Sequence, residues 1–113
     1  MNRDRALTLL AALAQATRLE AFRQLVQAGP GELAAGDLAA RLNITPPALS
    51  FHLRGLAHAG LIAARQQGRF IYYSADFDAM RSLVAFLTEN CCGGAACMPA
   101  QGSGRRTSLR RLS

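Results

Sequence analysis

The chain has 113 residues and a net charge of +6, from 13 basic and 7 acidic side chains, and every basic residue is arginine. This length suits one domain with a single modest core. An odd cysteine count, no signal-like N-terminus and no long apolar run predict a soluble cytoplasmic protein with reduced thiols and no membrane partner. No nucleophile, base and phosphate-binding loop can be named together, so an enzyme is not expected.

The first part of the chain has helical periodicity. A first helix is expected from Asp4 to Ala14, almost entirely apolar, which suits an interface. A second helix is expected to begin with a capping box between Thr17 and Glu20 and to end at Gly29-Pro30. A short third helix is expected from Gly36 to Leu42.

A fourth helix has a start signal, because Thr45 suits the N-cap and Pro46 suits the first helical position. Leu49, Leu53 and Leu56 then repeat at helical spacing and should face the core. Two short helices joined by a tight turn predict a helix-turn-helix.

The pattern then becomes extended. Two strands, Leu61–Gln66 and Arg69–Ser74, are expected to form a β-hairpin that turns near Gln67-Gly68, as a wing beside the helix-turn-helix. A last helix should run from Phe77 to Asn90, with Gly93-Gly94 ending it. The predicted fold class is therefore mainly α with a small β-hairpin, a winged helix-turn-helix.

The middle of the chain is basic because it contains no acidic residue. Between Arg41 and Tyr73 lie four arginines and both histidines but no carboxylate. Such a stretch favours binding to a polyanion, most simply double-stranded DNA, with a solvated basic face as the alternative. The predicted DNA-binding residues are Thr45, Pro46, Ser50, Phe51, His52, Arg54, Arg65 and Arg69. Phe51 could instead be a core residue, and His52 a capping or packing residue.

All three cysteines, Cys91, Cys92 and Cys97, fall within seven positions of one another. Three thiolates around trivalent arsenic or antimony form a neutral complex, whereas the same three around zinc leave a net charge and an open fourth position. Zinc is the weaker interpretation because no histidine lies near the cluster. The alternative without function is that the cysteines are buried apolar side chains.

The stretch from Thr45 to Ile62, which contains Ser-Phe-His-Leu-Arg-Gly-Leu-Ala-His-Ala-Gly-Leu, resembles the ArsR (ArsR/SmtB) winged-helix metalloregulators. Ala16-Thr-Arg-Leu19 and Gly68-Arg-Phe-Ile-Tyr-Tyr73 extend the resemblance over roughly residues 4 to 92. The resemblance implies a homodimer, built on the first and last helices, that represses its own operon until an inducer binds. The residues expected at that interface are Leu7, Leu10, Met80, Leu83, Val84 and Leu87.

The chain also departs from the family pattern. Many arsenic-responsive members have cysteines in the third helix, where this chain has Ala34 and Gly36, and the last helix lacks the histidine of zinc sensors. What remains resembles the arsenic-sensing subgroup whose Cys-Cys pair ends the last helix. Pro46 stands where glutamine is common, so the operator sequence cannot be transferred.

These observations predict a DNA-binding and dimerisation domain over residues 1–92 and a Gly/Arg-rich tail over 93–113, which carries Cys97 and is expected to be disordered beyond it. The predicted function is an arsenite-responsive repressor without a cofactor, whose inducer is As(III) and, as an option, Sb(III). Three alternatives stay open: a thiol redox or persulfide-responsive repressor, a methylarsenite sensor that uses two thiols, and a small thiol-based metal carrier.

Overall fold

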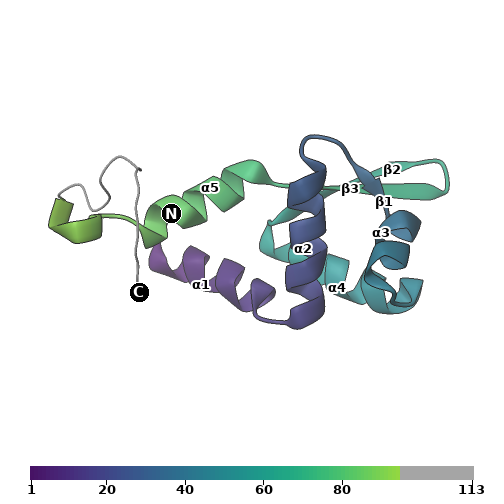
Figure 1. Cartoon of the computed structure of the whole chain (residues 1–113), viewed down its shortest axis with the longest axis horizontal. Helices are drawn as coiled ribbons and strands as arrows, with labels where there is room; N and C mark the ends of the chain where they lie inside the picture. The colour runs from purple at the N-terminus through teal and green to yellow at the C-terminus, as the bar shows by residue number, and fades with distance from the viewer. Residues whose placement is uncertain (95–113) are drawn as a thin grey trace, which may run out of the picture.

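The computed structural model describes residues 1–94, which form five α-helices and a three-stranded antiparallel sheet (Figure 1). The elements in chain order are α1 (Arg3–Leu13), α2 (Ala16–Ala28), β1 (Leu33–Ala34), α3 (Ala35–Leu42), α4 (Pro46–Ala59), β2 (Ile62–Gln67), β3 (Phe70–Ala75), α5 (Phe77–Leu87) and a 3-10 turn, η1 (Cys91–Gly94). Helices α1 and α5 lie side by side at one end, and the β2–β3 hairpin extends from the other (Figure 1). The predicted winged helix-turn-helix is confirmed. No described helix is long and apolar enough to span a bilayer.

The core consists mainly of leucines. Within residues 1–94, seven leucine side chains are fully buried: Leu9, Leu25, Leu38, Leu49, Leu53, Leu56 and Leu61. Each contributes roughly 1.5–3 kcal/mol relative to an exposed position. Three of them, Leu49, Leu53 and Leu56, form the predicted inward stripe of α4. The helical spacing of these leucines therefore decides which face of α4 is buried.

The start of α2 differs from the prediction. The helix begins at Ala16, and its N-cap is Gln15, whose side chain accepts a hydrogen bond of 2.8 Å from the Arg18 amide. Thr17 therefore lies inside the first turn, and the predicted capping box with Glu20 is wrong. Because α1 ends at Leu13, Gln15 is the extended residue at which the chain turns into α2.

The sheet contains one strand that the sequence did not reveal. Leu33 and Ala34 form β1, which pairs antiparallel with Tyr73 and Tyr72 of β3, so the strand order is β1-β3-β2. A strand of two residues has no detectable period. In the wing, Gln67 pairs with Phe70, so the two turn residues are Gly68 and Arg69, one position later than predicted. Gly68 has a φ of 63°, a backbone conformation that favours glycine.

Arg5 joins α1 to the C-terminal end of α4. Its Nη1 donates a hydrogen bond of 2.5 Å to the Ala59 carbonyl, and positive charge is favourable at this end of a helix. Gly60 follows with a φ of 89°, and a Cβ there would collide with the Arg5 guanidinium. The contact attaches α1 to the carboxyl end of α4.

We expect Arg5→Ala to lower the free energy of unfolding by about 1.5–3 kcal/mol, the range for a hydrogen bond to a charged group. Urea unfolding at constant protein concentration measures the change. Arg3→Ala, on the same helix at an exposed position, is the matched control and should change stability little. Equal effects of the two substitutions would contradict this role of Arg5.

Helix α5 ends earlier than predicted, at Leu87 and not at Asn90. The Thr88 hydroxyl donates to the Val84 carbonyl over 2.8 Å, which competes with continuation of the helix. Asn90 and Cys92 then both adopt a φ of 57°, in the left-handed region. The chain therefore leaves the helix axis before the first cysteine.

Candidate DNA-binding surface and thiol pair

The outward face of α4 forms an exposed stripe. Pro47, Phe51, Arg54 and His58 recur at i, i+4, i+7 and i+11, opposite the buried leucines, and all four are exposed. Phe51 is 58% exposed, so the alternative that it is a core residue is wrong. The prediction missed Pro47 and His58, although continuing the same spacing in both directions would have found them.

The other predicted residues of α4 lie at its start and along its edge. Thr45 is the N-cap, with its hydroxyl accepting from the Ala48 amide at 3.4 Å, and both Thr45 and Pro46 are exposed. Ser50 is half-buried. His52 is also half-buried, with its Nδ1 buried and without a hydrogen-bond partner in the described part of the chain. Its ring packs edge-on against Phe51, with 5.4 Å between centroids, which agrees better with the packing role weighed for it.

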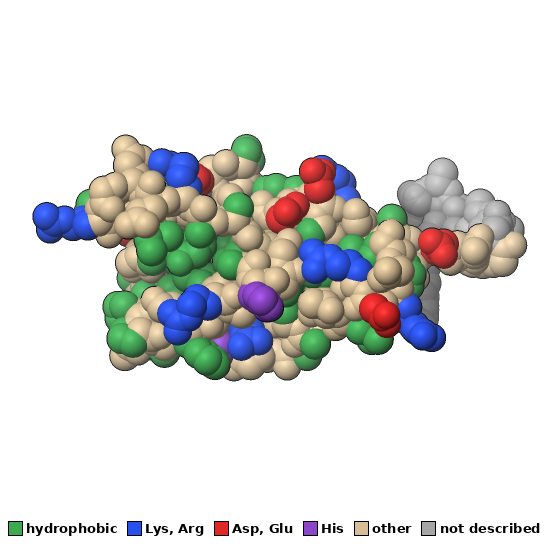
Figure 2. Space-filling view, turned by 180° about the vertical axis from the view of Figure 1, so that it is seen from behind, with side chains coloured by type: hydrophobic (Ala, Val, Ile, Leu, Met, Phe, Trp, Pro, Cys, Tyr) green, Lys and Arg blue, Asp and Glu red, His purple; other side chains and the backbone are tan. Residues whose placement is uncertain are grey.

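Charge is unevenly distributed over the molecule. In Figure 2 arginine side chains lie over both halves of the molecule, whereas most of the visible acidic side chains lie toward α1 and α5 and the histidine side chains lie over α4. Arg54 is exposed on α4, and Arg69 is exposed at the turn of the wing. These two arginines form no salt bridge with the described residues, so they are available to an external anion.

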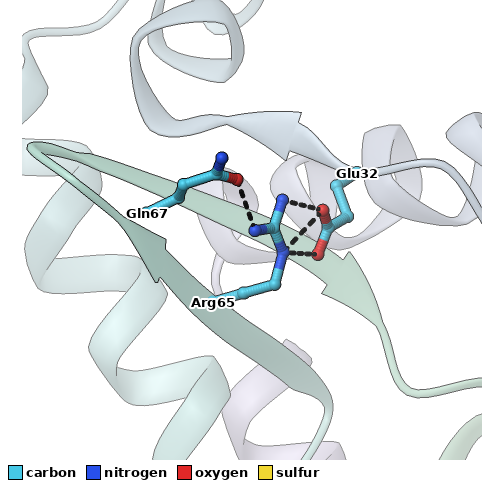
Figure 3. A network of polar contacts seen from close by, with 3 residues as sticks. All are labelled: Glu32, Arg65 and Gln67. Carbon is cyan, nitrogen blue, oxygen red and sulfur yellow. Dashed lines mark hydrogen bonds and ion pairs between the residues drawn. The ribbon is translucent and has the colours of Figure 1, made fainter.

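Arg65 has a different environment. Its Nη2 donates to Glu32 Oε1 over 2.7 Å, its Nε donates to both carboxylate oxygens at 3.0 and 3.1 Å, and its Nη1 donates to Gln67 over 2.7 Å (Figure 3). The guanidinium also lies over the Tyr72 ring, 4.9 Å from its centroid. Arg65 thus ties the segment before β1 to the wing. Its charge is paired within the chain, which Arg54 and Arg69 do not share among the described residues, and its predicted contact with phosphate stays a prediction.

The hydrogen bond from Arg65 lowers the pKa of Glu32 below its ordinary value of 4.5. A carboxyl group with a depressed pKa stabilises the folded state above its unfolded-state pKa, and this contribution is lost as the pH falls through the folded-state value. We therefore expect wild-type protein to be more stable than Glu32→Gln above pH 4.5, with the difference shrinking at lower pH. Urea unfolding across pH 3–7 measures it. Glu89→Gln, which removes an exposed carboxylate outside any described salt bridge, is the control; a constant difference would contradict the prediction.

The two described cysteines lie at the end opposite the wing, just beyond α5 (Figure 1). Cys91 and Cys92 are exposed, and their Sγ atoms are 3.7 Å apart. Cys97, the third predicted ligand, lies outside the described residues. Within residues 1–94 no group of three or more His, Cys, Asp or Glu side chains could hold a metal ion.

An apolar face is exposed on the two helices at the same end. Leu7 and Leu10 of α1 and Val84 and Leu87 of α5 are all exposed, although they are large hydrophobic residues. Met80 is half-buried beside them. Leu83 is only 6% exposed and belongs to the core of its own chain, so it differs from the other residues predicted for the interface.

Helices α2, α3 and α4 pack together, α4 has an exposed stripe, and the β2–β3 hairpin forms a wing. This combination defines a winged helix-turn-helix DNA-binding protein. Residues 13–65 match a family described as "Helix-turn-helix domain". The transcriptional activator HlyU of Vibrio cholerae is 30% identical over 91 residues, which cover 80% of this chain and 82% of HlyU. Its structure in the reduced form has a TM-score of 0.62, with 79% of this chain and 90% of that chain covered at 29% identity.

Two further solved structures are similar. A protein described as "Possible transcriptional regulator for arsenical resistance" is 35% identical, with a TM-score of 0.61 and coverage of 71% of this chain and 79% of that chain. A homodimeric winged helix-turn-helix domain from Mycobacterium bovis, described as a possible ArsR-family regulator, is 27% identical, with a TM-score of 0.62 and coverage of 82% and 86%. The chain belongs to the ArsR family of transcriptional regulators. It is a DNA-binding regulator and not an enzyme.

Proposed function

We propose that this protein is a homodimeric, arsenite-responsive repressor that leaves its operator when trivalent arsenic, or antimony, binds the thiolates of Cys91, Cys92 and Cys97. The observation that carries the proposal is the 3.7 Å separation of the Cys91 and Cys92 sulfurs at an exposed position beyond α5. The 35% identity to a protein described as "Possible transcriptional regulator for arsenical resistance" supports the same ligand class.

The separation of the sulfurs is suitable for a shared ion. Adjacent residues on a regular helix point about 100° apart, so an unbroken α5 would separate these two side chains. Here the helix has already ended at Leu87, and Cys92 has a φ of 57°. Bonds from sulfur to a metal such as zinc are about 2.3 Å long, so two sulfurs 3.7 Å apart can both reach one ion. In the reduced protein Cys97 would supply the third thiolate of a neutral complex.

The position of the thiols suggests how binding reaches DNA. The exposed apolar face of α1 and α5 would pair with a second copy. The similar domain from Mycobacterium bovis is homodimeric. α1 also contacts α4 through Arg5. An ion that repositions the end of α5 would therefore change the relative orientation of the two α4 helices. Coupling of roughly 1–3 kcal/mol per effector is usual, and each 1.4 kcal/mol weakens binding tenfold.

We expect arsenite to weaken operator binding by about 10–100-fold, from a coupling of this size. The measurement is fluorescence anisotropy of reduced protein on labelled DNA from upstream of its own gene, with zinc as the control ion. Cys91→Ser with Cys92→Ser should bind DNA normally and ignore arsenite. A double variant that still leaves DNA on adding arsenite would refute the thiol site.

A thiol redox or persulfide switch is the second candidate, because two exposed sulfurs this close can be oxidised together and HlyU has been solved in a reduced form. It predicts release by peroxide or polysulfide without arsenite.

The Cys97→Ser variant separates an arsenite sensor with three thiolate ligands from a methylarsenite sensor with two. If the variant loses its response to arsenite but keeps its response to methylarsenite, Cys97 is the third ligand. If it responds equally to both, the site consists of two thiols. A small thiol-based metal carrier would show no sequence-specific DNA binding. Membership of a family of DNA-binding regulators disfavours this alternative.

A further inference from the structure

One arginine outside the predicted DNA-binding set lies beside the outward stripe of α4. Arg18 is on α2, and its guanidinium packs directly on the α4 backbone at Gly55. A Cβ at position 55 would be 2.8 Å from Arg18 Cζ and 2.9 Å from its Nη2. Glycine inside a helix costs about 1 kcal/mol relative to alanine. The absent side chain at Gly55 provides the space that the guanidinium occupies.

The same guanidinium reaches the exposed stripe. Arg18 Cζ lies over the Phe51 ring, 5.8 Å from its centroid, and Phe51 is exposed at the centre of that stripe. On a helix, positions 51 and 55 lie one turn apart on the same face. The positive charge of Arg18 is thus held at the α2 edge of the surface that α4 presents.

Arg18 also lacks a counter-charge among the described residues. Arg23, Arg65 and Arg81 each form a salt bridge, whereas Arg18 forms none with the described residues. Its Nε is buried and has no hydrogen-bond partner in that part of the chain. Arginine stays protonated in proteins, and a guanidinium can bind a phosphate through two hydrogen bonds at once. A fixed, half-buried guanidinium without a carboxylate partner is therefore suited to an external anion.

We propose that Arg18 is a phosphate-binding residue, which contacts the DNA backbone beside the groove that α4 enters and which is held there by Gly55 and Phe51. The proposal rests on the DNA-binding function of the chain but not on its inducer. It places one backbone contact per chain on α2, outside the helix-turn-helix pair and the wing.

The test is fluorescence anisotropy on a short duplex of mixed sequence, without inducer, over about 50–200 mM salt, where phosphate contacts dominate binding. Wild-type binding confirms DNA binding itself. Arg18→Gln should raise Kd about tenfold and lower the salt exponent by about 0.9 per chain, or 1.8 per dimer. Arg18→Lys should keep the exponent. Arg23→Gln, on the same helix and paired with Glu20, is the matched control and should keep both values.

A variant that retains the charge provides the second arm. Gly55→Ala should displace the guanidinium from α4, raise Kd and leave thermal stability undiminished, because alanine favours the helix. If Arg18→Gln keeps the wild-type salt exponent, or Gly55→Ala keeps the wild-type Kd, Arg18 only packs α2 against α4 and the proposal is wrong. Should Arg18→Gln fail to fold, the Gly55→Ala result decides.

Discussion

A protein carrying Val84→Glu and Leu87→Glu is expected to be monomeric and to bind a palindromic operator at least a hundredfold more weakly than wild type. Both residues are large, apolar and exposed on α5, beside the exposed Leu7 and Leu10 of α1. In the proposed homodimer these side chains face a second copy. Two glutamates per chain would place four carboxylates in an apolar interface, where unpaired charges are strongly unfavourable.

The loss of affinity follows from the linkage of two half-sites. When one subunit of a dimer is bound, the second meets its half-site at a high effective concentration, and this linkage is worth about 10²–10⁴ in affinity. A monomer loses that gain although its own α4 is intact. Light scattering with size-exclusion chromatography measures the oligomeric state, and anisotropy measures operator binding.

Ser82→Glu is the matched control for these substitutions. It adds a carboxylate to an exposed position of α5 about 160° around the helix from Val84, away from the apolar stripe. It should remain dimeric and bind DNA as wild type does. A dimer of undiminished affinity in the Val84 and Leu87 double variant would show that this face is not the interface.

Leu56→Ala should lower the free energy of unfolding by about 2–5 kcal/mol, the range for truncating a fully buried leucine. Leu56 is 0% exposed and lies in the core cluster on the inward face of α4. A domain of this kind has a total stability of about 5–15 kcal/mol, so the loss is a large share. Urea unfolding at fixed protein concentration measures it, because dimerisation makes apparent stability depend on concentration.

Phe51→Ala is the companion variant on the opposite face of the same helix. Phe51 is exposed, so its truncation should change stability by less than about 0.5 kcal/mol while weakening DNA binding. The two variants thus separate the core face of α4 from its DNA-binding face. A Phe51→Ala protein as unstable as Leu56→Ala would contradict this division.

The arginines illustrate why the site was only partly predictable. Arg54 and Arg69 were expected to face DNA, and both are exposed without a described salt bridge. Arg65 was assigned the same role, but it pairs with Glu32, a residue 33 positions earlier that reaches it only after the sheet has formed. Composition cannot distinguish these arginines, because the partner of a charged side chain is chosen by tertiary proximity.

The end of α5 shows a similar limit. Apolar periodicity placed the helix and its stripe correctly, but the end was predicted three residues late. The hydrogen bond from the Thr88 hydroxyl to the Val84 carbonyl and the positive φ of Asn90 are local features, and the spacing of hydrophobic residues cannot predict them. They decide how Cys91 and Cys92 approach each other, and so they bear on the proposed ligand site.

The sequence by itself determined the winged helix-turn-helix, the inward leucines of α4 and the turn of the wing to within one residue. These features depend on short-range signals: the helical period, the Thr45 and Pro46 start, and a glycine at positive φ. Only the tertiary structure decided that β1 joins the sheet, that Glu32 pairs with Arg65, and that Gly55 admits Arg18 to the edge of the exposed stripe of α4. Each of these is a contact between residues more than 30 positions apart, and such contacts form only once the core has packed the helices together.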